Sequence, residues 1–349
     1  MGTAYGSEQF LHQLLAKAIS AGASDVHLKV GQPPGVRVAG ELVYFRVDKL
    51  QAEDTEAAAR VILGSRVPAE RFEELLEHDT SYSVEGLGRF RVNVYRQRAT
   101  YAVAMRSIPM KVPVVEELDL PHAAADLAMR DRGLLLVVGA AGNGKSTSLA
   151  AMVNEVNEKC PKHIVTIEDP IEFIHTDRRA TISQREVGFD TGSFALALRA
   201  SLRQDPDVIL VGEIRDAETM EIALQAAETG HLVMSTMHTP DVARTVNRLL
   251  ALGESQTDLR ERIADCMQGI VAQRLLPRVG GGLVLAAEVL VCTGTVREAL
   301  KRPESNPPLK ELMERGVTPY GMQTFQMCVR QLVKRGLVSP DYAKQHFVF

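Results

Sequence analysis

The sequence predicts an α/β protein in which a domain built on a parallel sheet follows a smaller α+β domain. The first observation behind this is a glycine-rich loop, Gly139 to Thr147, which fits G-x-x-x-x-G-K-[S/T]. The second is the alternation of apolar segments with helical patterns from residue 123 onward, which predicts βαβ units. The third is the alternation of apolar and polar side chains in much of the first 110 residues, which is typical of antiparallel strands.

The glycine-rich loop is predicted to hold the phosphates of a nucleotide. The apolar run 134–138 before it is typical of a buried parallel strand, and the apolar spacing from Leu149 to Val156 after it predicts a helix. Glycines let backbone N–H groups turn toward phosphate at a helix N-terminus. Lys145 is expected to reach the β- and γ-phosphates, and Ser146 to ligate Mg²⁺. The expected nucleotide-binding residues are Gly139, Gly142, Asn143, Gly144, Lys145, Ser146 and Thr147.

Composition excludes several classes of protein. The chain has 349 residues, of which 45% are hydrophobic and 24% charged, and no apolar run approaches the roughly 20 residues of a membrane span. A net charge of −4 and a pI of 6.2 give no overall attraction to nucleic acid. The start of the chain does not resemble a secretory signal, so a cytoplasmic location is expected. The cysteines form no C-x-x-C pair, which indicates ordinary buried thiols at positions 160, 266, 292 and 328.

The order of the expected elements places the domain boundaries. We expect a helix over 8–22, strands over 23–30, 36–38 and 43–47, helices within 52–78, and strands between 82 and 108. These form the first domain, 1–110. Residues 111–122 are predicted to be an interdomain linker, because Pro113 and Pro121 interrupt a stretch without periodicity. The second domain, 123–349, is expected to have strands at 134–138, 164–168, 208–212 and 232–237, and to be mainly helical from about 258.

The carboxyl ends of these strands carry candidate catalytic groups. Glu172 follows the strand 164–168 in the run Glu168-Asp-Pro-Ile-Glu172, and could activate a water beside the γ-phosphate. A solvated polar loop is the alternative. Glu213 ends the strand 208–212 and could support Mg²⁺, although a structural role is also open. His238 follows the strand 232–237 and could contact the γ-phosphate, while His231 precedes that strand.

Two groups of arginines admit a phosphate-binding interpretation. Arg199 and Arg203 lie four positions apart on a predicted helix, where they form either a solvated face or fingers that reach a neighbouring subunit's nucleotide. The first domain has further arginines close together in its strands. These are Arg89, Arg91, Arg96, Arg98 and Arg106.

Taken together, these stretches resemble the secretion ATPase superfamily that powers type II secretion and type IV pili. Residues 23–28 resemble its N-terminal motif, 166–172 its Asp box, 203–216 its Walker B region and 229–239 its His box. Within the superfamily the chain is similar to the pilus retraction branch, since it has neither the four-cysteine zinc module nor the longer N-terminal extension of assembly and secretion ATPases. One motif of that branch is altered here, where Thr295 to Leu300 keeps Arg297 but loses an asparagine.

The resemblance implies a PAS-like first domain, a RecA-like P-loop ATPase domain, and a homo-hexamer that binds ATP and Mg²⁺. It assigns phosphate and Mg²⁺ binding to Lys145 and Ser146, activation of water to Glu172, and support of Mg²⁺ to Glu213. His231 and His238 belong to its His box. The expected partners are an inner-membrane pilus platform protein and possibly a paralogous ATPase, at the cytoplasmic side of the membrane and without nucleic acid. Alternatives are a pilus assembly or type II secretion ATPase, a RecA-like nucleic-acid motor, and a regulatory subunit that does not hydrolyse ATP.

Overall fold

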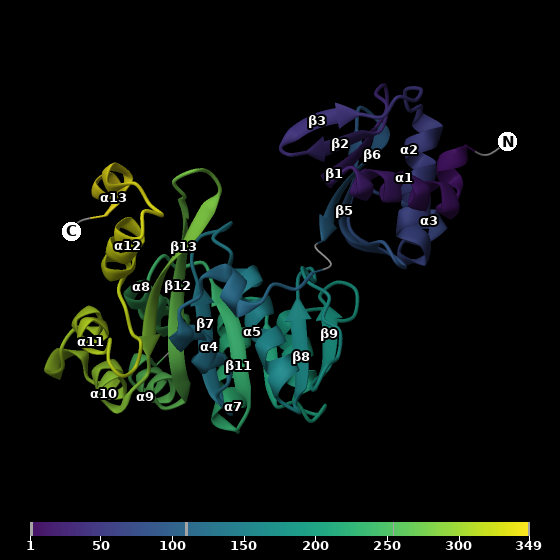
Figure 1. Cartoon of the computed structure of the whole chain (residues 1–349). Coiled ribbons are helices and arrows are strands. Elements are labelled where there is room, and N and C mark those ends of the chain that lie inside the picture. The colour runs from purple at the N-terminus through teal and green to yellow at the C-terminus, as the bar shows by residue number, and fades with distance from the viewer. Residues whose placement is uncertain (1–2, 109–110, 254, 348–349) are drawn as a thin grey trace. The chain divides into compact units, whose positions relative to one another are not determined.

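The fold is described from a computed structural model, which describes residues 3–108, 111–253 and 255–347 (Figure 1). The described chain forms two compact units, divided between Lys111 and Val112. Each unit has its own hydrophobic core, so we describe them separately. No helix among the described residues is both long and apolar enough to cross a bilayer.

The first unit is an antiparallel sheet packed against helices. The sheet order is β3-β2-β1-β6-β5-β4. Its strands are β1 (Ala23–Lys29), β2 (Gly35–Val38), β3 (Glu41–Tyr44), β4 (Glu77–Val84), β5 (Gly88–Gln97) and β6 (Thr100–Ile108). Its helices are α1 (Glu8–Ser20), α2 (Ala52–Leu63) and α3 (Ala69–Phe72), with short 3-10 turns at Ala4–Gly6 and Gly64–Arg66.

Local sequence signals account for these elements. The Ser7 side chain accepts a hydrogen bond from the backbone N–H of Phe10 and caps α1. Leu11 and Leu15 lie one turn apart on α1, so both face the core, where they are fully buried. The helical pattern expected over residues 52–78 ends at Phe72, and the chain is already a strand from Glu77.

The second unit is a largely parallel sheet in the order β13-β12-β7-β11-β10-β8-β9. All of its pairings are parallel except that of β13, which runs antiparallel to β12. Every residue of β7, β10 and β11 is buried, as expected for strands covered on both faces. The strands are β7 (Gly133–Val138), β8 (His163–Glu168), β9 (Thr181–Glu186), β10 (Val208–Val211), β11 (Leu232–Met237), β12 (Met267–Pro277) and β13 (Leu283–Val291).

Helices connect these strands and extend beyond them. In Figure 1 the elements after β13 gather near that edge strand. The helices are α4 (His122–Ala128), α5 (Lys145–Lys159), α6 (Phe194–Ser201), α7 (Ala217–Glu228), α8 (Val242–Leu252), α9 (Gln256–Cys266), α10 (Gly294–Lys301), α11 (Leu309–Arg315), α12 (Phe325–Lys334) and α13 (Pro340–His346), with 3-10 turns at Val115–Leu118 and Pro303–Ser305. The α/β class and the parallel sheet predicted from the sequence are confirmed.

The expectation of a mainly helical chain beyond residue 258 is wrong for residues 267–291, which form β12 and β13. Both strands are largely buried, and β12 pairs with β7 over residues 267–272. Gly280, Gly281 and Gly282 all have positive φ angles, which allows the tight connection between the two strands. A long apolar run does not by itself distinguish a buried strand from a buried helix.

The expected linker, 111–122, is largely packed against the second unit. Val115 and Leu120 are buried in the core of that unit, and Arg335 of α12 forms an ion pair with Asp119 at 3.4 Å. Pro109 and Met110, at the end of the expected first domain, lie outside the described residues.

Candidate functional site

The glycine-rich loop joins β7 directly to the first turn of α5. Gly139, Gly142 and Gly144 have φ angles of 151°, 78° and 77°, which L side chains rarely adopt. A Cβ atom on Gly139 would lie only 2.6 Å from the backbone oxygen of Gln273. Because α5 begins at Lys145, the loop presents the N-terminus of a 15-residue helix to a bound anion.

Lys145 is buried within the loop, and its Nζ donates a hydrogen bond to the backbone oxygen of Ala140 at 3.2 Å. Burial lowers the pKa of Lys145, while the charges of Glu213 and Glu172 act in the opposite direction. The lysine therefore lies within the electrostatic reach of both predicted carboxylates. Ser146 is exposed at the start of α5, so its hydroxyl is accessible to a ligand.

Strand β12 supports the loop from the side, and this was not anticipated from the sequence. The backbone N–H of Leu275 donates to Asn143 Oδ1 at 3.0 Å. The Gln273 side chain is fully buried and donates through Nε2 to Ser148 Oγ at 2.7 Å. A glutamine directly after the apolar run 270–272 was the available signal, since buried polar groups need partners.

Glu213 follows β10 and lies close to the side chains of Arg215 and His238. Its carboxylate forms an ion pair with Arg215, and its Oε2 lies 3.5 Å from His238 Nε2. The side chain of Glu213 is 14% exposed, whereas that of His238 is 52% exposed. His238 follows β11, whose carboxyl end adjoins that of β7, so the structure brings Lys145, Glu213 and His238 to one edge of the sheet.

Glu172 lies on the loop after β8 and is exposed. The loop contains a cis peptide between Asp169 and Pro170. Glu168, at the end of β8, accepts hydrogen bonds from Thr166 Oγ1 at 2.7 Å and from Gln184 Nε2 at 3.2 Å. Burial raises the pKa of Glu168, and hydrogen bonds that include one from the Glu172 backbone oppose this rise. Glu168 thus anchors the loop that carries Glu172.

The structure separates His231 from this group. His231 precedes β11 and its Nδ1 lies 2.9 Å from the backbone oxygen of Ala226. It is seven residues from His238 along an extended chain, or about 23 Å. Within one chain His231 therefore lies at the opposite edge of the sheet from the glycine-rich loop.

Arg199 is on α6, whereas Arg203 lies in the turn beyond the end of that helix at Ser201, so the two do not share one helix as expected. Both are exposed and bonded within the second unit. Arg199 forms an ion pair with Glu218 at 3.2 Å, and Arg203 Nη1 donates to the Arg199 backbone oxygen at 3.3 Å. Neither contact involves the glycine-rich loop, so a phosphate-binding role within one chain has no support from these bonds.

Arginines of the first unit also have partners in that unit. Arg89 donates to Ser81 Oγ, Arg96 to the Glu73 backbone oxygen, and Arg106 to Asp25 Oδ1. These bonds indicate a structural role for Arg89, Arg96 and Arg106 within the first unit. Arg91 and Arg98 keep their predicted alternatives, a solvated face or a phosphate contact.

The donors available to a metal ion fit Mg²⁺. In the described part of the chain, no group of three or more His, Cys, Asp or Glu side chains is arranged to hold a metal. Mg²⁺ is commonly bound by one or two protein oxygens together with substrate phosphates and water. The carboxylate of Glu213 and the hydroxyl of Ser146 are oxygen donors of that kind, so a metal here would require a nucleotide to complete its shell.

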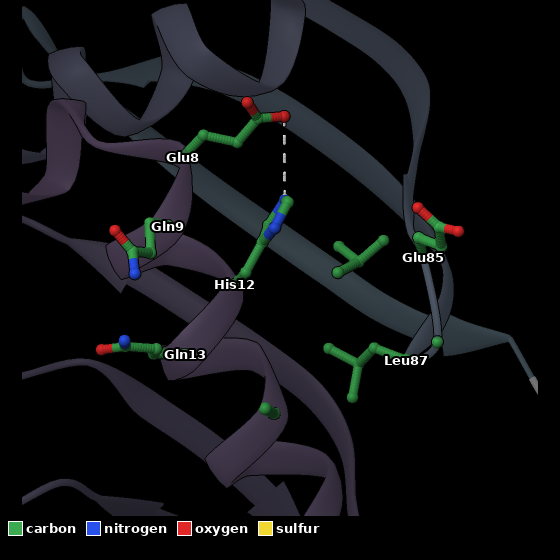
Figure 2. A pocket seen from close by; sticks show the side chains of 9 residues that line it. Glu8, Gln9, His12, Gln13, Glu85 and Leu87 are labelled. Atoms are coloured by element: carbon green, nitrogen blue, oxygen red, sulfur yellow. Dashed lines mark ion pairs between the residues drawn. The ribbon is translucent and has the colours of Figure 1, made fainter.

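A groove of about 580 Å³ in the first unit is separate from this site (Figure 2). Figure 2 shows Glu8 and His12 on α1 facing Glu85 and Leu87 on the β4–β5 connection. His12 Nε2 lies 2.9 Å from the hydroxyl of Tyr82, and burial, with the nearby charge of Glu8, raises the pKa of Tyr82 to about 12. None of the predicted site residues lines this groove.

Comparison with known proteins identifies the chain's relatives. Residues 6–281 match the family described as type II/IV secretion system protein. The type IV pilus retractation ATPase PilT of Pseudomonas aeruginosa is 40% identical over 335 residues, covering 95% of this chain and 96% of the relative. A twitching motility protein of Neisseria gonorrhoeae is 38% identical over 89% of this chain and 83% of its own length. The crystal structure of the pilus retraction motor PilT with bound ADP has a TM-score of 0.88 at 41% identity, with 95% of each chain covered.

Proposed function

Because the chain belongs to the type II/IV secretion system protein family, we propose that it is an ATP-hydrolysing motor that drives retraction of type IV pili. The observation that carries this proposal is that the glycine-rich loop after β7 and the strand ends followed by Glu172, Glu213 and His238 lie at one edge of the same parallel sheet. A phosphate-binding loop with carboxylates at the same sheet edge suits phosphoryl transfer to water.

We derive a role for each residue from its position. Lys145 and the N-terminus of α5 bind the β- and γ-phosphates and stabilise charge that develops during hydrolysis. Glu172 orients the attacking water and accepts its proton. Ser146 and Glu213 would hold Mg²⁺, which when bound neutralises phosphate charge. His238, 3.5 Å from Glu213, links that carboxylate to the γ-phosphate end of the site.

Substitutions test the catalytic assignment. We expect Lys145→Ala to abolish ATP hydrolysis through loss of binding, and Glu172→Gln to bind ATP normally while losing hydrolysis. The matched control is Glu314→Gln, which changes an exposed glutamate on α11. Full phosphate release by Glu172→Gln would remove Glu172 from its assigned role.

We further propose that the motor is a homo-hexamer in which Arg199 and Arg203 act on the nucleotide of a neighbouring subunit. The exposure of Arg199 on α6 and of Arg203 in the turn after it supports this, because a finger acting in trans must be accessible. Mixing Lys145→Ala with Arg203→Ala subunits tests it. Activity above that of either variant alone is expected, since mixed rings contain interfaces with both residues intact. No recovery in mixed rings of proven composition would show that Arg203 acts within its own subunit or not at all.

In the cell, we propose a location on the cytoplasmic side of the inner membrane, against the platform protein of the pilus. The direction of force is tested by counting surface pili in a strain that lacks this protein. An excess of non-retracting pili is expected, whereas bald cells would indicate an assembly ATPase. ATPase stimulation by DNA or RNA would instead favour a nucleic-acid motor, and the absence of phosphate release by the purified protein would favour a regulatory subunit.

A further inference from the structure

Strand β13 contains a single polar side chain, Glu288, and the catalytic roles proposed above do not use it. The other residues of the strand, between Leu283 and Val291, are all leucine, valine or alanine. Glu288 is only 7% exposed. A buried carboxylate is costly unless it is paired or hydrogen-bonded, and packing alone would favour an apolar side chain at this position. Glu288 therefore needs a specific partner.

The partner of Glu288 is the N-terminus of α8. Glu288 Oε1 accepts a hydrogen bond from the backbone N–H of Val242 at 2.9 Å, and this contact is buried. Val242 is the first residue of α8, so its N–H has no acceptor inside the helix. The side chain of Asp241 accepts a second bond in this turn, from the backbone N–H of Arg244 at 2.8 Å. Two carboxylates, one of them on β13, thus hold the first turn of α8.

Glu288 also lies close to the N-terminus of α12, which begins at Phe325. Burial raises the pKa of Glu288, and the charge of Asp241 acts in the same direction. Hydrogen bonds from the backbones of Val242 and Phe325, together with the charge of Arg274, oppose this rise. Figure 1 shows both helices beside β13. A carboxylate is well placed between two helix N-termini, because each presents partial positive charge.

The start of α8 determines where His238 lies. Residues 239–241 are all that separates His238 from Val242. The hydroxyl of Thr239 lies 2.7 Å from that of Thr245 in α8, and both side chains are buried. On its other side His238 directly follows β11. The position of His238 is therefore set by β11 before it and by α8 after it.

We propose that Glu288 is a positioning residue for ATP hydrolysis, which holds the first turn of α8 and thereby keeps His238 in place beside Glu213. Glu288 acts through His238 rather than on the nucleotide. This role rests on the proposed function, in which His238 lies at the γ-phosphate end of the site, and it adds a supporting residue to that function. A purely structural role is the alternative, and it would lower stability without a specific effect on turnover.

Kinetics and unfolding of full-length variants separate these two roles. Glu288→Leu removes the acceptor, whereas Glu288→Gln keeps an acceptor oxygen in a side chain of nearly the same shape. Thr293→Val is the matched control, because the Thr293 side chain accepts a hydrogen bond from the Val296 backbone N–H and so caps α10, another helix of this unit. The kcat and KM for ATP are measured for each variant and corrected for the folded fraction given by urea unfolding.

We expect Glu288→Leu to lower kcat by about 10- to 100-fold, since a misplacement of about 1 Å at a catalytic site can cost this much. The KM for ATP should change less than about twofold, because the phosphate-binding loop is untouched. Glu288→Gln should keep most of the wild-type kcat, and Thr293→Val should lose stability alone. A wild-type kcat in Glu288→Leu, or an equal loss of kcat in Thr293→Val, would overturn the proposal.

A double-mutant cycle with His238→Ala tests whether Glu288 acts through His238. Residual hydrolysis is followed in single turnovers with labelled ATP. In the His238→Ala background, Glu288→Leu should lower the rate less than about twofold. A loss of the same size in both backgrounds would overturn the proposal. Wild-type rates in His238→Ala would refute the role of His238 and this proposal with it, whereas absence of hydrolysis by the wild type would refute the ATPase function itself.

Thr245→Val answers the same question if Glu288→Leu does not fold. This substitution removes the hydroxyl contact with Thr239 with almost no change of shape. The same loss of kcat is expected, and it should also disappear in the His238→Ala background. An unchanged kcat in Thr245→Val, or a loss that persists without His238, would show that the start of α8 does not position His238.

Discussion

Gln273 and Ser148 are joined by a 2.7 Å hydrogen bond between Nε2 and Oγ, across 125 residues of sequence, and both side chains are buried. The bond ties β12 to the first turn of α5, which begins at Lys145. Because the backbone oxygen of Gln273 also packs against Gly139, this one residue contacts both ends of the loop.

Gln273→Leu should therefore weaken nucleotide binding without removing a catalytic group. We expect the KM for ATP to rise severalfold with kcat little changed, and the free energy of unfolding to fall by about 1–3 kcal/mol, since Ser148 is left buried without its partner. Steady-state kinetics and urea unfolding provide both values. In a Ser148→Ala background the same substitution should cost less stability. A fall in kcat at constant KM would indicate only a smaller folded fraction.

Glu168 predicts a specific dependence of stability on pH. Its pKa is raised above 4.5 in the folded protein because the carboxyl is buried, so the folded state binds a proton more tightly than the unfolded state. Its contribution to stability is therefore greatest below about pH 4.5 and is lost as the pH rises through the folded pKa.

The variant Glu168→Gln has no carboxyl group to ionise at this position, so its stability should not show this decrease with rising pH. The difference in unfolding free energy, wild type minus variant, should decrease as the pH rises above about 4.5, as followed by urea unfolding at each pH. Glu314→Gln, an exposed change, should give a difference independent of pH. If the difference for Glu168→Gln instead increased with pH, the pKa of Glu168 would not be raised in the folded protein.

Local patterns were sufficient to predict the parts of the site that depend on short stretches of chain. The apolar run 134–138 and the loop up to Lys145 specify a buried strand and a helix N-terminus without reference to distant residues. The same holds for Glu213, which was expected at a strand end and lies directly after β10.

Features that depend on pairing between distant segments were not predicted. The segment that contains Gln273 becomes a strand because it pairs with β7, more than 120 residues earlier, and no local pattern distinguishes it from a buried helix. His231 and His238 share one motif in the sequence, yet the length of the intervening strand places them at opposite ends. Any contact of Arg199 with a neighbouring subunit is also beyond what one chain can specify.

Substitution of Glu213 tests the proposed magnesium site. Glu213→Gln removes the carboxylate charge but keeps a similar shape, so we expect the Mg²⁺ concentration for half-maximal ATPase activity to rise about 10- to 100-fold. Binding of metal-free ATP should be unchanged or tighter, because a negative charge has been removed near the phosphates. Titration of Mg²⁺ at fixed ATP measures the first effect and calorimetry in chelator the second. Glu314→Gln, which changes an exposed glutamate on α11, is the control. An unchanged Mg²⁺ requirement would remove Glu213 from the metal site.

Substitution of Arg297 tests whether the altered motif, Thr295 to Leu300, has a structural or a functional role. Its guanidinium donates to the backbone oxygens of Ala264 and, at 2.6 Å, Asp265, which lie in the last turn of α9. Cations at a helix C-terminus satisfy free carbonyl groups and interact favourably with the helix dipole.

We expect Arg297→Gln to lower the free energy of unfolding by about 1.5–3 kcal/mol, the usual value for hydrogen bonds from a charged group. The KM and kcat for ATP, measured well below the unfolding temperature, should be unchanged because Arg297 contacts none of the site residues. Arg297→Lys should recover part of the lost stability, and Arg248→Gln, on the exposed face of α8, should have no effect. A variant of Arg297 with normal stability but defective pilus retraction would show that the motif acts in the motor cycle rather than in holding α9 to α10.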